Sequence, residues 1–510
     1  MAIFPSFSEF KTEFQGGQNQ VVYAPLAADL DTPVSLMHKL TGAANYSFIL
    51  ESVTGGEIRG RYSIIGMDPD VVWKCHDGIA RISCDQESSF KRWIDEADAP
   101  FTSLRHLIKR SRIDLPTDLP ASSAGLFGYL GYDMVRLVED LPQINPDPLN
   151  LPDAILFRPT IIAVLDGVKS EVIVVSPAWA DSGLNAQDAF DQARERVLNA
   201  VQKIESRQEP QKRNLGTPRA LRDPISNLSR ETYREVVDRA KHYIRAGDVF
   251  QVVPSQRWKQ EFDLPPFALY RALRRTNPSP FMFFFNFGDF QIIGASPEIL
   301  VRVFDREITL RPIAGTRPRG ADPAEDQQLA DELLGDAKER AEHLMLLDLG
   351  RNDVGRVSRI GTVRPTETFV IERYSHVMHI ASNVTGELAE GEDALSALLA
   401  GLPAGTVAGA PKVRAMEIID ELEPEKRGVY AGGVGYFSAN GDMDMCIALR
   451  TAVLKDRHLY IQAGGGIVHD SDPDVEWKET VDKSRALRRA AENAAMFTGY
   501  DTSIGDGLKN

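Results

Sequence analysis

Two pairs of glutamates have the spacing of a metal site built on helices. Glu339 and Glu342 lie three residues apart in DAKERAEHLMLLDLG, and Glu476 and Glu479 repeat that spacing in SDPDVEWKETVDKS. Residues three apart share one face of a helix, where two negative charges repel each other unless a cation lies between them. Mg²⁺ suits such oxygen ligands and often completes its shell with water and an anionic substrate. The pattern therefore indicates a Mg²⁺ site, with solvent-exposed helix faces as the alternative.

The residues after the first pair predict a buried helix. They are apolar almost without interruption: Leu344, Met345, Leu346, Leu347 and Leu349. A helix that is apolar on nearly every side is stable only when other elements surround it. We therefore expect the paired acids to begin a helix in the interior of the protein.

Three further segments could bind an anion. Gly464, Gly465 and Gly466 follow the strand-like HLYIQA, and their unhindered N–H groups could hold a carboxylate; a turn at the strand end is the alternative. RPIAGTRPRG (311–320) predicts a stiff basic loop suited to a di-anion, with a solvated turn as the alternative. Arg450 lies in the strand-like DMCIALRTAV, where a buried guanidinium needs an anion, either a ligand or an internal Asp or Glu.

Other chemistry has weaker support. His379 in HVMHIASNV and Glu298 in GASPEIL are isolated, and each taken alone is more readily a core residue than a catalyst. GTVAGAPK lacks the GK[ST] end of a phosphate-binding loop, and AGGVGYF lacks the third glycine of a dinucleotide fingerprint. The sequence contains no GxSxG or HExxH motif. These features argue against a nucleotide site and against acyl hydrolysis.

Composition favours a small-molecule substrate. The chain has 510 residues and a formal net charge of -15, which argues against nucleic acid or an anionic membrane as a partner. Its three cysteines form no CxxC pair and no disulfide framework, which is typical of a reducing compartment. No stretch approaches the roughly 20 apolar residues of a membrane span. We therefore expect a cytoplasmic protein.

The elements that must position these residues form two predicted regions. Residues 1–206 contain mostly short β-like runs, as expected for antiparallel sheet, and end with a helix at 186–206. Residues 207–229 are polar, contain three prolines and are predicted to be a linker. Residues 230–500 open with a helix that stops at Gly247 and continue with irregularly ordered strands and helices, so the fold class is α+β.

Nine motifs in order resemble the chorismate-utilising enzymes, and within them the large subunits of the anthranilate synthases. The resemblance covers roughly residues 20 to 500 and is carried by LESVTGGEIRGRYSIIG, GDVFQVVPSQR, NPSPFMFF, RPIAGTRPRG, AEHLMLLDLGRNDVGRV, RYSHVMHI, GTVAGAPKVRAMEIID, YAGGVGYF and QAGGGIV. It implies a two-domain α+β fold with antiparallel sheets packed face to face and helices outside. It also implies chorismate as the substrate, ammonia as the nucleophile, and anthranilate and pyruvate as the products.

The resemblance assigns roles to single residues. Glu342 and Glu479 match the Mg²⁺ ligands, with Glu339 and Glu476 beside them. Glu298 matches the acid that protonates the departing hydroxyl, and His379 matches the base of the elimination step. The positions that match substrate-binding residues are Gln251, Gly315, Thr316, Thr406, Tyr430, Arg450, Gly464, Gly465 and Gly466.

Two positions separate this chain from other branches of the family. Aminodeoxychorismate synthases typically have a nucleophilic lysine at the position of Ala314, and isochorismate and salicylate synthases have a lysine that activates water at the position of Gln251. Two alternatives remain: an enzyme that stops at the aminated intermediate, aminodeoxyisochorismate, before pyruvate leaves, and a catalytically silent tryptophan-binding regulator.

The resemblance further implies a partner and a regulator. The chain has no glutaminase motif, so ammonia is expected from a separate glutamine amidotransferase subunit. Two segments resemble the tryptophan-binding residues of the family, and tryptophan is therefore expected to inhibit the enzyme: Leu50, Glu51 and Ser52, together with Pro280, Phe281 and Met282.

Overall fold

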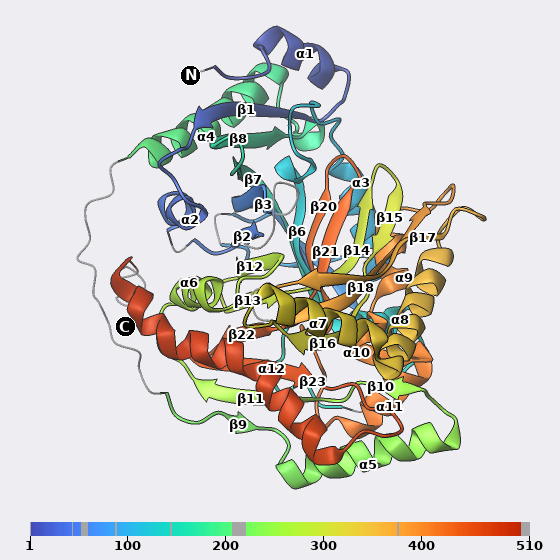
Figure 1. Cartoon of the computed structure of the whole chain (residues 1–510). Coiled ribbons are helices and arrows are strands. Elements are labelled where there is room, and N and C mark those ends of the chain that lie inside the picture. The colour runs from blue at the N-terminus through green and yellow to red at the C-terminus, as the bar shows by residue number, and fades with distance from the viewer. Residues whose placement is uncertain are drawn as a thin grey trace.

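One antiparallel sheet runs through the whole chain (Figure 1). The computed structural model describes residues 2–42, 44–52, 60–86, 89–142, 145–206, 221–374 and 377–500, except the side chains of residues 499 and 500. Strands of the first region are β1 (Gln20–Ala27), β2 (Ser47–Glu51), β3 (Tyr62–His76), β4 (Ile79–Ser83), β5 (Ile94–Asp95), β6 (Gly125–Leu130), β7 (Ala154–Asp166) and β8 (Glu171–Ala178). Those of the second region are β9 (Ile225–Ser226), β11 (Ser255–Glu261), β12 (Phe281–Asn286), β13 (Phe290–Ser296), β14 (Ile299–Phe304), β15 (Glu307–Leu310), β16 (Ile313–Pro318), β17 (Arg364–Arg373), β18 (Val377–Glu387), β20 (Gly433–Ser438), β21 (Met443–Ile447), β22 (Thr451–Lys455) and β23 (His458–Gly464). A separate two-stranded pair joins β10 (Gln251–Val252) to β19 (Gly409–Ala410).

The sheet folds back on itself, so that its two halves pack face to face. Phe48 of β2 and Phe127 of β6 have ring centroids 4.4 Å apart although β3 and β7 separate their strands in the hydrogen-bonded order. Phe157 of β7 and Phe285 of β12 pack in the same way, with centroids 6.3 Å apart. Buried aromatic side chains thus fill the space between the two halves. The predicted fold, antiparallel sheets packed face to face, is confirmed.

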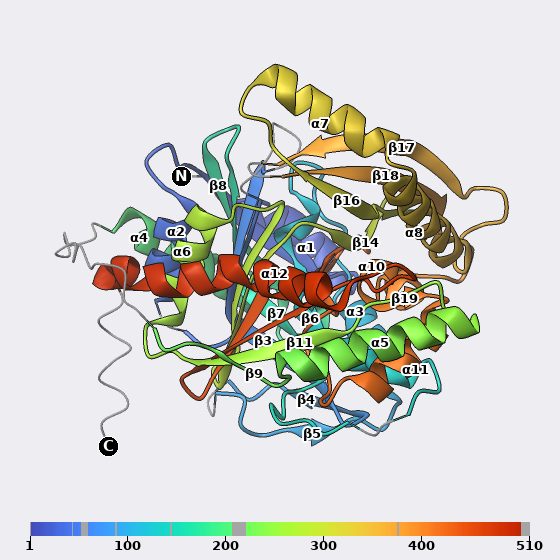
Figure 2. The same ribbon diagram turned by 60° about the horizontal axis from the view of Figure 1, so that its bottom comes forward.

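Helices cover the outer faces of the sheet (Figures 1 and 2). Apolar side chains of α1, α2, α4, α6 and α12 pack on one part of it, and those of α3, α5, α8, α9 and α11 pack on another. Their bounds are α1 (Phe7–Gln15), α2 (Pro33–Thr41), α3 (Pro100–Arg110), α4 (Ala186–Glu205), α5 (Arg230–Ala246), α6 (Pro266–Thr276), α7 (Pro323–Gly335), α8 (Ala337–Gly355), α9 (Ala394–Gly401), α10 (Gly405–Ala408), α11 (Lys412–Leu422) and α12 (Pro473–Asn493). Short 3₁₀ turns occupy Ala121–Ser123, Tyr132–Leu137, Ala180–Ser182 and Ala494–Tyr500.

Two helices that the sequence predicted form where expected because their ends carry caps. The side chain of Asn185 accepts a hydrogen bond from the N–H of Asp188 at the start of α4. The helix predicted to stop at Gly247 is α5, and Gly247 has φ +85°, a conformation that favours glycine. Both helices bury one apolar face on the sheet and leave the other to solvent.

Strand pairing joins the two predicted regions. β2 pairs with β12 and β6 pairs with β20, so strands of residues 1–206 and of residues 230–500 belong to one sheet. Of the predicted linker, residues 207–220 lie outside the described residues, and β9 within it pairs with β11. The division into a regulatory and a catalytic domain at this linker stays a prediction.

Prolines divide two of the predicted strands. VFQVVPSQRW is split into β10 and β11 by Val253 and Pro254, and QIIGASPEILVRV is split into β13 and β14 by Pro297 and Glu298. Proline lacks the N–H that a continuous strand would donate. The second break is important for the candidate site because it places Glu298 in the turn between β13 and β14, outside the hydrogen-bonded part of either strand.

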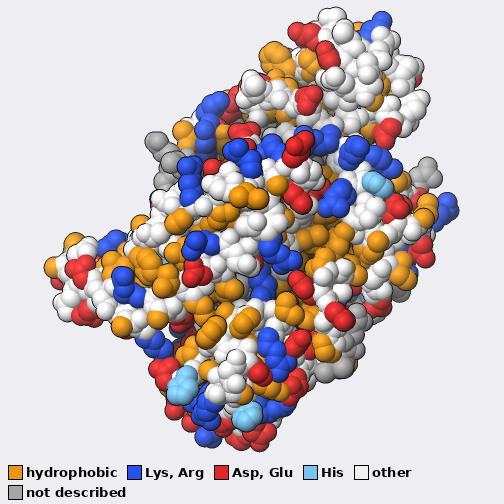
Figure 3. Space-filling view, turned by 90° about the vertical axis from the view of Figure 1, so that its right-hand side faces the viewer, with side chains coloured by type: hydrophobic (Ala, Val, Ile, Leu, Met, Phe, Trp, Pro, Cys, Tyr) orange, Lys and Arg blue, Asp and Glu red, His pale blue; other side chains and the backbone are white. Residues whose placement is uncertain are grey.

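On the face shown in Figure 3, basic and acidic side chains are interspersed with apolar ones and form no continuous basic surface. Within the described residues, no helix combines the length and the apolarity needed to cross a membrane.

Candidate active site

The arginines of RPIAGTRPRG are bound by carboxylates of the protein itself. The segment forms β16 and the turn before it, so the predicted loop is wrong. Each guanidinium has partners: Arg311 with Glu367 (2.6 Å) and Glu372 (2.8 Å), Arg317 with Asp336 (3.0 Å) and Glu339 (3.2 Å), and Arg319 with Asp326 (2.5 Å). They order the strands and helices around the site and are not free to bind a di-anionic ligand.

Arg450 is different because no described carboxylate forms an ion pair with it. It lies between β21 and β22 with φ +48°, a backbone conformation that costs a residue with a side chain about 1–3 kcal/mol. Burial lowers the pKa of its guanidinium, and the nearby Tyr374 and Glu298 act in the opposite direction. The sequence left open whether Arg450 meets a ligand or an internal acid; the structure leaves it available to an anionic ligand.

Glu298 is a buried acid that keeps its proton at neutral pH. Its side chain is 6% exposed in the turn between β13 and β14. Thr406 of α10 donates a hydrogen bond from Oγ1 to Glu298 Oε1 (3.1 Å), and the backbone of Ile313 also hydrogen-bonds the carboxyl. Burial outweighs these contacts and the charge of Arg450, and raises the pKa of Glu298 to about 8. Such a carboxyl can act as a general acid.

His379 on β18 is held as a neutral base. Its Nδ1 lies 2.8 Å from the carbonyl oxygen of Gly315 and 3.1 Å from Thr316 Oγ1. A carbonyl can only accept, so Nδ1 carries the proton and Nε2 has the free electron pair. Burial lowers the pKa of His379, and the charges of Arg450 and Lys483 lower it further, whereas Gly315 and Glu372 oppose the shift. The ring is therefore uncharged at neutral pH.

The acid and the base lie near the same guanidinium. The charge of Arg450 acts on the pKa of both Glu298 and His379, and the ring of Tyr374 packs against the imidazole with centroids 5.5 Å apart. Segments far apart in sequence thus bring together a proton donor (Glu298), a proton acceptor (His379) and a cation that has no ion pair among the described residues (Arg450). This arrangement can bind an anionic substrate and move protons at two of its atoms.

The glutamates of α8 lie on its first two turns. The side chain of Asp336 caps the helix by accepting from the N–H groups of Lys338 and Glu339. Glu342 accepts a hydrogen bond from Gln251 Nε2 (3.0 Å), and burial together with the charges of Glu339 and Glu479 raises the pKa of Glu342.

The prediction that α8 is apolar on all sides is wrong. Leu344 is 50% exposed, while His343, Leu346 and Leu347 are buried. Helix α8 is amphipathic because the sheet covers only one of its sides.

The glutamates of α12 face the same region. Glu476 is 8% exposed and its Oε2 has no hydrogen-bond partner among the described residues. Burial and the charge of Glu479 raise the pKa of Glu476. Glu479 itself pairs with Lys483 (2.7 Å) at the surface. The charge of Glu479 on α12 thus acts on Glu342 of α8. No three His, Cys, Asp or Glu side chains of the described residues form a ready metal-binding group, and the Mg²⁺ site stays a prediction.

The glycines of QAGGGIV are required by close neighbours. A Cβ on Gly464 would lie 2.8 Å from the carbonyl oxygen of Pro254 and 3.0 Å from the hydroxyl of Tyr430, and one on Gly466 would lie 2.6 Å from Gln251 Nε2. The N–H of Gly465 donates to the oxygen of Pro254 (3.2 Å), so the prediction that it is free for a ligand is wrong. The N–H of Gly466 has no hydrogen bond among the described residues and stays a candidate donor to a substrate.

Tyr430 lies beside these glycines. Its side chain is 6% exposed, and burial raises its pKa to about 12, so its hydroxyl remains a hydrogen-bond donor at all working pH values.

The residues predicted to bind tryptophan line one cavity of about 460 Å³ beside the paired strands β2 and β12. Its walls include all six: Leu50, Glu51, Ser52, Pro280, Phe281 and Met282. Glu51 is already fixed by Arg274 (2.6 Å) and by the hydroxyl of Tyr270. The far wall holds Arg311, Glu372 and Tyr374, and Tyr374 is the residue that packs on His379.

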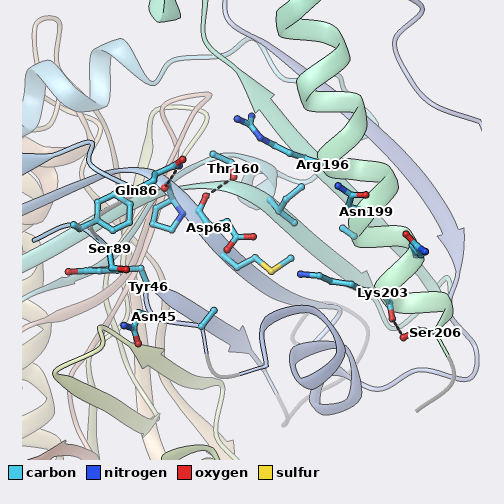
Figure 4. A pocket seen from close by; sticks show the side chains of 17 residues that line it. Asn45, Tyr46, Asp68, Gln86, Ser89, Thr160, Arg196, Asn199, Lys203 and Ser206 are labelled. Atoms are coloured by element: carbon cyan, nitrogen blue, oxygen red, sulfur yellow. Dashed lines mark hydrogen bonds between the residues drawn. The ribbon is translucent and has the colours of Figure 1, made fainter. Parts of the chain in front are cut away.

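A larger cavity, about 930 Å³, lies elsewhere, between α4 and strands β3 and β7 (Figure 4). Arg196, Asn199 and Lys203 of α4 face it on one side, and Asp68 and Tyr46 line the other. None of the predicted site residues borders it, so size alone does not identify the active site.

Sequence reasoning missed Tyr374 and the acids that hold it. The Tyr374 hydroxyl donates to Glu372 (2.7 Å), which in turn pairs with Arg311. The available signal was its position in RYSHVMHI, five residues before His379. That spacing crosses from the end of β17 to β18, which brings the two rings together.

Comparison with known proteins agrees with this site. Residues 48–489 match the sequence profile of the family described as chorismate binding enzyme. The chain belongs to the chorismate binding enzyme family.

The relatives narrow the position of the chain within that family. Anthranilate synthase component 1 of Cereibacter sphaeroides is 68% identical over 494 residues, 96% of this chain and 98% of the relative. The crystal structure of anthranilate synthase component I from Streptococcus pneumoniae TIGR4 superposes with a TM-score of 0.75 at 38% identity, over 91% of this chain and 98% of that one. The menaquinone-specific isochorismate synthase of Escherichia coli shares the fold, with a TM-score of 0.70 at 19% identity over 94% and 99% of the two chains.

Proposed function

We propose that this chain converts chorismate and ammonia to anthranilate and pyruvate. The observation that supports this most strongly is the buried acid Glu298 and the neutral base His379, both close to the unpaired cation Arg450, in a chain 68% identical to an anthranilate synthase component 1. The reaction needs one proton donor and one proton acceptor acting on a substrate with carboxylates. The residues present supply each of them.

In the first step, the electron pair of ammonia forms the bond to C2, the ring double bonds shift toward C4, the C4 hydroxyl leaves, and the added nitrogen releases one proton to solvent. Glu298 gives its proton to that hydroxyl, the C4–O bond breaks with its electron pair on oxygen, and water departs. Arg450 pairs with a substrate carboxylate and fixes the ring beside the acid. Because Glu298 is buried, it is about nine-tenths protonated at pH 7.

In the second step, the ring becomes aromatic. His379 Nε2 takes the proton at C2, the C–H electrons form the last ring double bond, and the bond between the ring and the enolpyruvyl oxygen breaks with its electron pair on oxygen. The enolpyruvate that leaves takes a proton at its methylene carbon and becomes pyruvate. The carbonyl of Gly315 holds Nδ1–H and keeps Nε2 directed as an acceptor.

We infer that Glu342 and Glu479 hold Mg²⁺, with Glu339 and Glu476 beside them. The donor set fits a hard cation, because burial and neighbouring carboxylates raise the pKa of Glu342 and of Glu476, and Glu476 Oε2 lacks a partner among the described residues. When bound, Mg²⁺ neutralises negative charge on the substrate.

Ammonia is expected to come from a glutamine amidotransferase subunit. The relatives are named component 1, which fits a two-component enzyme. The three cysteines support this, since burial raises the pKa of each thiol and none is suited to act as the nucleophile of a glutaminase. Free cysteines also fit a cytoplasmic location.

We also propose that tryptophan occupies the cavity beside β2 and β12 and inhibits the enzyme. Pro280 and Phe281 offer apolar contact for an indole, and Ser52 and Glu51 offer polar groups for the amino acid. Inhibition requires that tryptophan bind the inactive arrangement more tightly than the active one.

The test is a direct assay of the purified chain with chorismate, Mg²⁺ and an ammonium salt. Anthranilate fluorescence and pyruvate should rise together in equal amounts. Loss of chorismate with no anthranilate, or amination without pyruvate, would refute the proposal.

A further inference from the structure

Glu298 lies almost completely inside the protein. It is 6% exposed, and its Oε1 is occupied by the hydroxyl of Thr406. If the proposed function is correct, each turnover removes its proton and leaves a buried carboxylate. The proton must return before the next chorismate can react, and a path through the protein can return it while the substrate site is occupied.

A small cavity adjoins Glu298 on the side of α8. It measures about 30 Å³, which is room for about one or two water molecules. Glu298 and Thr406 line it, together with Leu349, Gly350 and Asp353 of α8. The cavity therefore has carboxyl groups and a hydroxyl in its wall, and such a polar cavity can hold water.

Asp353 contributes an unused oxygen to this wall. It is 3% exposed, and Oδ2 accepts a hydrogen bond from Lys412 Nζ (2.7 Å) on α11. Oδ1 is buried and has no hydrogen-bond partner among the described residues. Burial raises the pKa of Asp353, while Lys412, Arg356 and Asn352 lower it. Buried carboxylate oxygens are normally satisfied, so a bound water is the expected partner of Oδ1.

We propose that Asp353 returns the proton to Glu298 through water held in this cavity. The water gives one proton to the Glu298 carboxylate and takes one from the Asp353 carboxyl, so only O–H bonds form and break. Asp353 recovers its proton from solvent on the side of Lys412, whose side chain is 11% exposed. The sum is one proton from solvent to Glu298 in each turnover. Asp353 is thus a positioning and relay residue that does not touch chorismate.

The first test compares the rate of a single turnover with the rate of repeated turnovers. Asp353→Asn keeps the shape of the side chain but cannot release a proton, and Asp348→Asn makes the same change at an exposed position of the same helix. With enzyme in excess over chorismate, amination by Asp353→Asn should match wild type. With chorismate in excess, its rate should fall about tenfold or more, and the solvent deuterium isotope effect on kcat should rise. Asp348→Asn should change neither rate.

The second test fills the cavity without removing the acid. A Cβ on Gly350 would meet only Val384 at 3.8 Å and Pro312 at 4.0 Å, which are ordinary contacts, and alanine favours a helix more than glycine does. Gly350→Ala should therefore keep or raise the thermal midpoint, yet reproduce the slow multiple turnover of Asp353→Asn. A variant that only disturbs the structure would slow the single turnover too.

The outcomes distinguish the two proposals. If wild type and Asp348→Asn form no anthranilate, the proposed function fails. If they form it and Asp353→Asn loses single and multiple turnover equally, or loses neither, the proton return through Asp353 is wrong.

Discussion

Replacing Glu298 by Gln should abolish catalysis. It should also remove a loss of folding stability that grows as the pH rises. Gln keeps the size of the side chain and can still accept the hydrogen bond from Thr406, but it has no proton to give. Losing a general acid typically lowers a rate about 10² to 10⁴-fold, and chorismate amination should fall by that amount.

The stability effect follows from the raised pKa. Between the ordinary glutamate value of 4.5 and about 8, folded Glu298 holds a proton that the unfolded chain has released. The folded state therefore binds more protons in this range, and its stability decreases as the pH rises. Integrated to pH 8, the loss is on the order of 4 kcal/mol. Gln cannot ionise, so this loss should be absent from the variant.

The assay is thermal unfolding of wild type and Glu298→Gln at pH values from 5 to 9, with Glu390→Gln as an exposed control. The thermal midpoint of Glu298→Gln should rise relative to that of wild type as the pH rises, whereas the midpoint of the control should change with pH as that of wild type does. In wild type, kcat/KM for chorismate at fixed free NH₃ should fall about tenfold from pH 7 to pH 9. A constant difference in thermal midpoint across this range, together with activity that stays flat to pH 9, would refute the assignment of Glu298 as the buried acid.

Other expectations concern the metal, the effector and the nucleophile. The Glu342→Gln variant should fold, because the substitution removes a negative charge that Glu339 and Glu479 repel. It should bind Mg²⁺ at least about tenfold more weakly by calorimetry, and unchanged affinity would exclude Glu342 as a ligand. In the Ser52→Phe variant, the phenyl ring should fill the cavity beside β2 and β12, so the variant should keep catalytic activity but lose inhibition by tryptophan. Inhibition that persists would show that tryptophan binds at another site. The purified chain should use ammonia and not glutamine until a glutaminase subunit is added, and glutamine-dependent anthranilate formation by the chain alone would contradict the need for that partner.

Local patterns predicted the features that depend on neighbours in sequence. The helix at 186–206, the stop at Gly247 and the i, i+3 glutamate pairs are all set within a few residues, and the structure places them as expected. The strand breaks at Pro254 and Pro297 also have a local cause, because proline lacks the N–H that a continuous strand would donate.

The errors came from features that depend on distant partners. Arg311 seemed free in sequence because Glu367 and Glu372, which neutralise it, lie 56 and 61 residues away. Leu344 belonged to an apolar run, but the sheet reaches only one side of α8 and leaves it half exposed. The pairing of β2 with β12, which builds the cavity for the effector, joins segments about 230 residues apart and has no local signal.

The separate roles of Glu298 and His379 can be tested most directly by assaying a variant of each residue with chorismate and, separately, with the aminated, pyruvyl-bearing intermediate. Glu298→Gln should fail with chorismate but convert the aminated, pyruvyl-bearing intermediate to anthranilate at close to the wild-type rate. His379→Met should do the reverse: it should aminate chorismate, accumulate that intermediate and release little pyruvate. If both variants lose both half-reactions to the same extent, the acid and the base do not act in separate steps as proposed.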